Sequence, residues 1–527
     1  MCKLSFINFS LCIVLCKQSD KKLLSKFTTD VGAVTVKKVL AADIAKSQER
    51  GGKTRTLLPG QDKYDALLGW LKQGGAKFSK LELRYYTVDY RGVHARSRLE
   101  RDEIILSVPL PLIMTSDVAK ASTIGQRIRS SGCQLRSSHS WLACLLLQER
   151  NNPDSFYAPY LNTLPQHYRN MPIFFDKEEL KELTGSFSLK MIEDRKISLK
   201  AEYDNIVRSI PEFAKYHHLE FFWARLAVIT RIFGFEVGTH KTDGLVAMAD
   251  MLNHKRPNET SWHFDNGLNA FTITTTKRLL KGGQIFDSYG RKCNSRYFVN
   301  YGFSLDVNED NQVAVFFQLP RPIDEADQTE LMSYQLKAKL IGPNMRRFQI
   351  PFEHKEKVTR RCVSFLRVAY ADIEELVPLT KLESLEKIDP ISIKNEALVM
   401  GALARQAEKV LAGFPTTLEE DNALLSSSDS KLTMNVRFCV LMRRGEKEVL
   451  QAYIDLDRTI QEVKDMDLRS LKKYLSRHVN NRGMFILLLI IYSLLCFGVC
   501  GRSLGFVFLK GMYVSRDTER EDKAVTL

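Results

Sequence analysis

The chain has 527 residues, 44% of them apolar, which is enough for two or three packed domains rather than one. Its formal net charge of +15 fits a solvated basic surface, an acidic protein partner or a membrane surface. Binding to nucleic acid is the weakest interpretation of the charge, because the chain has no arginine-rich arm, zinc finger or aromatic-basic RNA motif. The ten cysteines form no C-x-x-C pair, so no metal site and no redox motif is predicted, and several lie in apolar stretches, as reduced buried thiols do.

Residues 1–60 are predicted to be a basic, disordered N-terminal segment. An apolar run from Leu4 to Cys16 is too short to span a bilayer and has no small-residue cleavage site. Residues 17–60 are basic and polar, a composition typical of linkers or disorder. A weak targeting peptide and a wrongly assigned start of the chain both fit this stretch.

A short helix that ends in glycine is predicted from Tyr64 to Gly75. Alternating strands follow, and the turn between two of them is Tyr90-Arg91-Gly92. Glycine has no side chain, so Gly92 could let a ligand approach the backbone closely.

Residues 139–235 are predicted to be mainly helical. Leucines recur through residues 142–147, but the proline-punctuated stretch 151–175 cannot be one helix. The apolar run from Phe221 to Phe235 is predicted to be a single helix.

The most informative stretch runs from Gly244 to Gly302. Its first piece, GLVAMADMLNH, is apolar and then ends in Asp250, Asn253 and His254. Polar residues at the end of a buried element are often where chemistry or capping is found. An Asn-His pair also has an ordinary explanation as a turn or helix stop.

The second piece of that stretch, GGQIFDSYG, alternates along a predicted half-buried strand. Ile285, Asp287 and Tyr289 share one face, and Phe286 and Ser288 share the other. The strand is expected to end at the turn after Tyr289, which would leave a phenol at its tip. A tyrosine alone is more often a core residue with a satisfied hydroxyl.

Residues 325–465 are predicted to form a separate helical domain, with apolar residues at helical spacing from Val399 to Leu411 and a stop at Gly413 and Pro415. Residues 484–500 carry no charge and lie at the lower length limit for a membrane helix. Basic residues precede them, so a tail anchor with a cytoplasmic-facing catalytic part is one expectation, and a buried helix or a misassigned chain end is the alternative. Residues 502–527 form the tail.

Together, the ADxxNH sequence at 249–254 and the later YGRKCN at 289–294 resemble the catalytic half of a SET domain. The form is that of the branch containing the Rubisco large-subunit lysine methyltransferases and the actin-histidine methyltransferase. The segment from Glu149 to Pro165 resembles the family's E-x-x-x-P-x-S-x-x-x-P-Y-x-x-x-L-P pattern. PTTLEEDNALL and LMRRGEKEVL resemble its C-terminal substrate-binding domain, so the resemblance covers roughly Tyr64 to Asp455.

The resemblance implies an α+β fold. A SET domain of small β-sheets with a pseudoknot-like threaded segment would occupy residues 61–320, with a helical insert at about 130–225. An all-helical substrate-binding domain would occupy residues 325–465.

The resemblance also implies an S-adenosylmethionine-dependent protein methyltransferase in which Tyr289 is the catalytic phenol. Asn253 and His254 would bind the cofactor mainly through their main chain, and Arg231 would lie near its carboxylate. The cofactor-binding residues implied are Gly92, Arg231, Asn253, His254, Tyr289 and Phe303. The family commonly has two glycines in the turn at Tyr90-Arg91-Gly92, and here one is missing.

Methyl transfer to lysine sets three physical demands. Aromatic faces and carbonyls must hold a sulfonium, the nucleophile needs an in-line path to the methyl, and the amine must be neutral. A free lysine has a pKa of about 10.4, so only about one in 2,500 is neutral at pH 7. The site must therefore favour the neutral amine by desolvation or by repulsion from the sulfonium.

The acceptor is predicted to be lysine, with Phe233, Ala249 and Lys292 contacting the substrate. Lysine-modifying members of the family carry Phe and Ala where this chain has Phe233 and Ala249, whereas the actin-histidine member carries Asn and Trp there. Asparagine can hydrogen-bond an imidazole nitrogen and phenylalanine cannot. Lys292 has an alternative explanation as a solvated surface lysine.

Two other functions stay open from the sequence: protein-histidine methylation, and a non-catalytic SET-like scaffold that recruits a partner. The expected partner is a protein substrate, and the expected state is a monomer. The expected location is cytoplasmic-facing, with tail anchoring, organellar and nuclear placement as alternatives.

Overall fold

The computed structural model describes residues 61–86, 90–135, 137–324, 326–352, 356–427 and 432–463, together with the single residues 466, 470 and 474. The predicted basic N-terminus, the predicted tail anchor at 484–500 and the 502–527 tail lie outside these residues. Within the part described, none of the helices combines the length and the apolarity that crossing a membrane requires.

The chain divides into two compact units. The described residues of the smaller unit are mainly the turn around Arg84–Arg91, where the amide of Tyr86 donates to the carbonyl of Tyr90 at 2.9 Å and the two rings lie 5.0 Å apart. The larger unit contains Lys63–Leu83 and the chain from Gly92 onward, and it holds the elements described below apart from the first residues of α3 and β2 and the last residues of β1.

Small sheets, rather than one large one, form the β part of the molecule. Their strand orders are β1-β2-β10-β7, β3-β9-β8, β4-β6-β5 and β11-β12. The strands are β1 (Leu81–Tyr85), β2 (Arg91–Ala95), β3 (Ile104–Pro109), β4 (Met114–Thr115), β5 (Ile232–Val237), β6 (His240–Leu245), β7 (Asn253–His254), β8 (Thr260–Asp265), β9 (Ala270–Thr275), β10 (Gln284–Asp287), β11 (Gln312–Phe317) and β12 (Arg346–Pro351).

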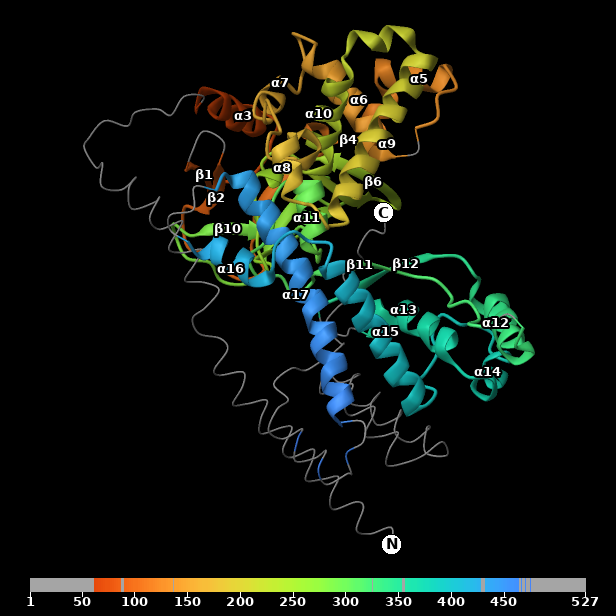
Figure 1. Ribbon diagram of the computed structural model, residues 1–527. Helices are drawn as coiled ribbons and strands as arrows, with labels where there is room; N and C mark the ends of the chain where they lie inside the picture. Colours follow the sequence, from red (N-terminus) through yellow and green to blue (C-terminus); the bar gives the residue numbers. More distant parts are fainter. Residues whose placement is uncertain are drawn as a thin grey trace. The chain divides into compact units, whose positions relative to one another are not determined.

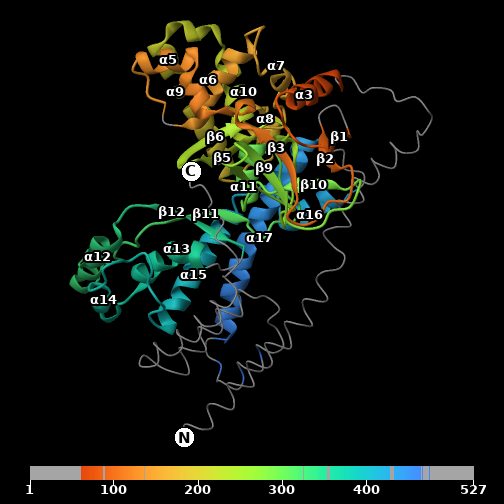
Figure 2. The same cartoon turned by 180° about the vertical axis from the view of Figure 1, so that it is seen from behind.

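Helices make up most of the rest, as Figures 1 and 2 show. Those before the last sheet are α3 (Gln61–Gln73), α4 (Ser116–Ala121), α5 (Thr123–Ser130), α6 (Ser138–Arg150), α7 (Ala158–Leu161), α8 (Lys177–Lys181), α9 (Ser188–Ser209), α10 (His218–Ile229) and α11 (Asn294–Tyr301). Those after β11 are α12 (Gln328–Ile341), α13 (Glu356–Tyr370), α14 (Ile373–Leu379), α15 (Ile393–Leu411), α16 (Leu418–Ser426) and α17 (Met434–Val463). The α+β fold and the helical insert between β4 and β5 agree with the prediction.

An aromatic core packs the β5–β6 hairpin against the β8–β9 hairpin. Phe235 stacks on Phe264 with ring centroids 5.6 Å apart, and Phe233 meets Phe271 edge to face at 5.1 Å. Burial of such rings is a large stabilising term for so small a pair of sheets.

The prediction of one helix from Phe221 to Phe235 is wrong at its C-terminal end. Helix α10 stops at Ile229, and β5 pairs with β6 from Ile232 onward. The hydroxyl of Thr230 donates back to the Leu226 carbonyl at 2.8 Å. Tertiary pairing of the strand therefore overrides the local apolar pattern, which cannot separate a helix from a strand over so short a run.

The C-terminal domain is helical apart from β12, which the prediction of an all-helical domain did not contain. Strand β12 pairs antiparallel with β11 in continuous register, from Gln312 opposite Pro351 to Phe317 opposite Arg346. Helices α15 and α17 lie side by side in both views, and their apolar faces share one core (Figures 1 and 2). Buried members of that core include Val363, Leu366, Val399, Leu403, Leu450 and Tyr453.

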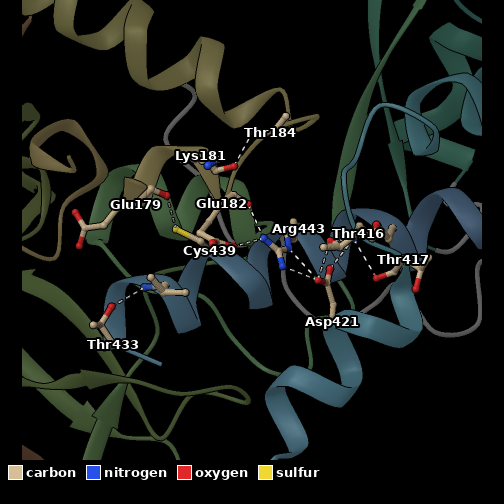
Figure 3. A network of polar contacts seen from close by, with 12 residues as sticks. Glu179, Lys181, Glu182, Thr184, Thr416, Thr417, Asp421, Thr433, Cys439 and Arg443 are labelled. Atoms are coloured by element: carbon tan, nitrogen blue, oxygen red, sulfur yellow. Dashed lines mark hydrogen bonds and ion pairs between the residues drawn. The ribbon is translucent and has the colours of Figure 1, made fainter. Parts of the chain in front are cut away.

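A buried polar network ties α17 to α16 and to the end of α8 (Figure 3). Arg443 donates to Asp421 from Nε at 2.9 Å and from Nη2 at 2.7 Å, and it donates to the Glu182 carbonyl at 2.8 Å. Lys447 donates to the other oxygen of Asp421 at 2.7 Å and to the Thr416 carbonyl at 2.6 Å. The network thus joins the C-terminal domain to the helical insert.

Helix α17 also contacts the loop between α11 and β11. The Ser304 hydroxyl donates to the Phe438 carbonyl at 3.0 Å, and Arg444 pairs with Asp306 at 2.9 Å. At Gly445 the helix approaches so closely that a Cβ atom would lie 2.3 Å from Asn311 Nδ2. The C-terminal helix α17 therefore packs against the loop that follows α11, a short distance along the chain from Tyr289.

Candidate active site

The two distant motifs meet at the pairing of β7 with β10. These strands run parallel, with Asn253 opposite Phe286 and His254 opposite Asp287. The amide of Tyr289 donates to His254 Nδ1 at 3.0 Å, and its hydroxyl donates to the Leu252 carbonyl at 2.9 Å. The Asn-His pair and the tyrosine, which the resemblance assigns to one active site, therefore lie together in the structure.

Aromatic rings surround this meeting point. Tyr289 stacks on Tyr301 with centroids 5.0 Å apart, and Tyr297 stacks on Phe303 at 5.2 Å. The His254 ring lies 5.1 Å from Tyr289, 4.9 Å from Tyr297 and 6.1 Å from Phe303. Such ring faces attract a cation without supplying a full negative charge.

Helix α11 and the two residues after it place three of these rings. Tyr297 and Tyr301 are one helical turn apart and therefore share a face. Gly302 ends the helix with φ 74°, in the left-handed region that glycine tolerates. A Cβ at Gly302 would lie 2.5 Å from Asn170 Nδ2, so glycine is needed both for the turn and for the close approach. The turn returns Phe303 to the cluster.

Burial keeps the phenols protonated and His254 neutral at physiological pH. Burial raises the pKa of the Tyr289 phenol above its ordinary value and raises that of Tyr301 to about 12. Burial, with Arg256 and Lys292 nearby, lowers the pKa of His254 to about 4. His254 Nδ1 is thus an acceptor for the Tyr289 amide, in keeping with their hydrogen bond.

Arg231 lies at the end of α10 and forms a buried ion pair with Asp250. Arg231 Nη1 is 3.0 Å from Asp250 Oδ2, and the Asp250 side chain is 0% exposed. The same Oδ2 accepts a hydrogen bond at 2.9 Å from the hydroxyl of Tyr160 in the helical insert. Three segments of the chain therefore converge on one carboxylate.

Several buried polar atoms of these residues have no hydrogen-bond partner among the residues that the structure describes: Asp250 Oδ1, Arg231 Nε and His254 Nε2. An unsatisfied buried polar group costs free energy, so such atoms commonly face a ligand or water. The aromatic rings suit a sulfonium, and the free guanidinium N–H suits a carboxylate. The donor set therefore fits S-adenosylmethionine.

The other predicted site residues are placed as follows. Gly92 lies in β2, which pairs with β10 on the side away from β7. Lys292 donates from Nζ to the Tyr289 carbonyl and lies 5.9 Å from the centre of the Tyr301 ring. Its pKa is lowered by burial and then by Arg296, so it is not an ordinary solvated lysine.

The two residues predicted to determine whether lysine or histidine is the acceptor are not part of the aromatic cluster around Tyr289. Ala249 is buried and directly precedes Asp250. Phe233 belongs to the aromatic core between the hairpins, 5.4 Å from Trp262 and 5.1 Å from Phe271. No ring contact or hydrogen bond recorded between described residues joins Phe233 to Tyr289.

Sequence reasoning gave no role to Tyr160, Tyr297 or Tyr301. The four-residue spacing of Tyr297 and Tyr301, directly after the Tyr289 motif, was a usable signal for two rings on one helical face. The hydrogen bond from Tyr160 to Asp250 joins residues 90 positions apart in the sequence, and no local sequence pattern predicts it.

Comparison with known proteins adds the following. Residues 90–290 match the SET domain family, and residues 329–450 match the Rubisco LSMT substrate-binding family. The actin-histidine N-methyltransferase of Papio anubis is 25% identical over 414 residues, which is 74% of this chain and 67% of that protein. The corresponding protein of Gallus gallus is 26% identical over 411 residues, covering 74% and 68%.

Solved structures show the same fold. One, described as the SET domain of LSMT bound to lysine and AdoHcy, has a TM-score of 0.62 at 22% identity and covers 80% of this chain and 97% of that chain. Another, described as Rubisco LSMT bound to AdoMet, has a TM-score of 0.60 at 21% identity and covers 82% and 99%.

Proposed function

We propose that this chain, a SET-domain protein methyltransferase with a Rubisco LSMT substrate-binding domain, transfers methyl groups from S-adenosylmethionine to a lysine side chain of a protein substrate. The observation that carries the proposal is the joint placement of Asn253, His254 and Tyr289 at the β7–β10 pairing, inside a cluster of aromatic rings. The SET match extends over both strands.

S-adenosylmethionine, when bound, supplies an electrophilic methyl on a sulfonium. In this chain the faces of Tyr289, Tyr301 and Phe303 would stabilise that positive charge. Arg231 would face the carboxylate, because its Nε is buried and has no partner among the described residues.

Tyr289 would orient the acceptor nitrogen. Its hydroxyl proton is directed to the Leu252 carbonyl, so a lone pair of the phenol oxygen is left to accept from an amine N–H. Burial holds the pKa of the phenol above its ordinary value, so the group stays uncharged. An uncharged phenol does not stabilise the protonated form of the acceptor amine, as a phenolate would. The same dry surroundings lower the pKa of Lys292, which is the direction that an acceptor lysine needs.

Lysine is proposed over histidine because this chain carries Phe233 and Ala249, the residue types that the lysine-modifying members of the resembled branch carry there, with Phe233 packed in the core between the hairpins rather than against Tyr289. Neither side chain can hydrogen-bond an imidazole, and both are buried. Histidine is the second candidate, because similar proteins are named actin-histidine N-methyltransferases.

Methylation assays with isotopically labelled S-adenosylmethionine would test the proposal. A cell lysate lacking this protein would serve as substrate, with product residues identified by amino-acid analysis. Methyl-lysine that is lost with Tyr289→Phe would support the proposal. Methyl-histidine alone would overturn lysine specificity, and cofactor binding without any transfer would favour the scaffold function.

A further inference from the structure

We infer that Tyr160, from the helical insert, is a positioning residue for cofactor binding: it fixes the Asp250 carboxylate and thereby the Arg231 guanidinium. The inference rests on the proposed function, in which Arg231 faces the carboxylate end of S-adenosylmethionine. Tyr160 itself has no assigned contact with cofactor or substrate.

The geometry puts two donors on one oxygen. Asp250 Oδ2 accepts from Arg231 Nη1 at 3.0 Å and from the Tyr160 hydroxyl at 2.9 Å. Arg231 Nη1 also lies 3.3 Å from the Asp250 carbonyl, so the guanidinium is held by both the side chain and the backbone of one residue. Two donors from different segments of the chain therefore share Oδ2, and Oδ1 and Arg231 Nε are left without hydrogen-bond partners among the described residues.

Tyr160 is itself rigidly held. It lies in the short helix α7, is 1% exposed, and its carbonyl accepts from the Thr163 hydroxyl at 2.7 Å. A few residues later, the Pro165 carbonyl accepts from Trp223 Nε1 at 2.8 Å. Trp223 belongs to α10, the helix that precedes Arg231. The insert is therefore attached at two points to the elements that place Arg231.

The Tyr160 hydroxyl can act as a donor throughout the working pH range. Burial, followed by the charge of Asp250, holds its pKa well above the ordinary value of tyrosine. Removing this hydroxyl would leave Asp250 Oδ2 with one donor instead of two in a dry environment. The carboxylate could then rotate, and the guanidinium would turn with it away from the orientation that suits a ligand carboxylate.

Tyr160→Phe tests the inference. The KM and the dissociation constant for S-adenosylmethionine should rise about tenfold, while kcat stays within about twofold, because the hydrogen bond serves cofactor binding and not the reacting atoms. In an Asp250→Ala background, Tyr160→Phe should have little further effect on the dissociation constant, because the acceptor of the hydrogen bond is already gone.

Tyr203→Phe is the matched control. Tyr203 is in the same insert, and its hydroxyl donates at 2.7 Å to the Tyr216 carbonyl rather than to Asp250. It should leave the dissociation constant unchanged. Equal cofactor affinity in Tyr160→Phe and wild type would overturn the inference, as would an equal loss of affinity in both Tyr→Phe variants. If the wild-type protein bound no S-adenosylmethionine in calorimetry, the proposed function would fail instead.

Discussion

Tyr289 is held by hydrogen bonds at both its backbone amide and its side-chain hydroxyl. These bonds explain how it keeps a fixed orientation although it lies beyond the end of β10. Its amide is bonded to His254 and its hydroxyl to the Leu252 carbonyl. Asp287, two residues earlier, is 5% exposed and accepts from the Thr260 hydroxyl at 3.2 Å. These three contacts come from residues 252–260, so the site is made by one segment closing on another.

Tyr289→Phe should lower turnover by about a hundredfold and leave the dissociation constant for S-adenosylmethionine within about threefold. The ring faces remain, but the oxygen that orients the acceptor is lost. Single-turnover methylation and calorimetry would measure the two effects. Loss of cofactor binding in the variant would instead make Tyr289 a structural residue.

Asp287→Asn should change the pH dependence of stability. Burial raises the pKa of Asp287 from 3.8 to about 6, so between these values the folded state binds more protons than the unfolded state. Stability from this group therefore falls as pH rises through that window, and asparagine removes the loss. The free energy of unfolding of the variant, relative to wild type, should rise by about 2 kcal/mol between pH 4 and pH 7.5.

Urea unfolding at several pH values would measure this difference. A difference that did not change with pH would contradict the prediction. Thr260→Val is a useful companion, because it removes the hydroxyl that stabilises the charged carboxylate and should steepen the loss of stability above pH 6.

At the scale of elements, the turn at Gly302 after α11 places Phe303 in the aromatic cluster around Tyr289. Gly302 and Gly132 both have φ 74°, but only at Gly302 would a Cβ meet other atoms, 2.6 Å from the Asn170 carbonyl oxygen. The comparison separates the cost of a left-handed backbone from the cost of a steric clash.

Gly302→Ala should lower the free energy of unfolding by about 3 kcal/mol or more, and Gly132→Ala by only about 1 kcal/mol. Gly302→Ala should also weaken cofactor binding, since Phe303 follows the turn. Thermal and urea unfolding of both variants would measure the effects. Equal losses would show that Asn170 gives way and that the close approach carries no cost.

The elements differed in how well the sequence could predict them. Strand β10 follows its alternating pattern, with Ile285 and Asp287 buried, and helix α15 ends as its glycine and proline stop predicts. Strand β5 was missed because its apolar residues continue the pattern of α10, and only pairing with β6 separates the two. In the site, the structure brings together the two motifs to which the resemblance assigns the chemistry, whereas a role for Tyr160 could not be predicted from its place in the Glu149–Pro165 pattern, because that role depends on a contact with a residue far along the chain.

At the scale of the whole molecule, buried charges connect the C-terminal helix to the insert (Figure 3). Arg443 is 2% exposed, and Lys447 and Asp421 are 0% exposed. Burial lowers the pKa of Lys447, and Asp421 acts against that effect. Asp421 is thus the fully buried carboxylate that both cations share: Arg443 is paired with Glu182 as well, whereas removal of Asp421 takes away the carboxylate that is ion-paired with Lys447.

Asp421→Asn should lower the free energy of unfolding by about 3–5 kcal/mol, as expected when a buried ion pair loses one partner. Asp194→Asn is the matched control, because its pair with Lys190 is more than half exposed and should be worth less than about 1 kcal/mol. Chemical unfolding of both variants would measure the difference. Similar small losses in the two would show that the network contributes little.

The three contacts of α17 with the 304–311 loop bear on how the chain can be divided. That loop is also fastened to Asn294, whose amide accepts from the Leu305 backbone at 3.1 Å and donates to the Leu305 carbonyl at 2.8 Å. Cutting the chain after β11 would remove the helix that covers Asn311 and Ser304. The residues up to β11 are therefore not a module that can be exchanged between proteins, and any graft that keeps the aromatic cluster around Tyr289 has to bring α17 along with it.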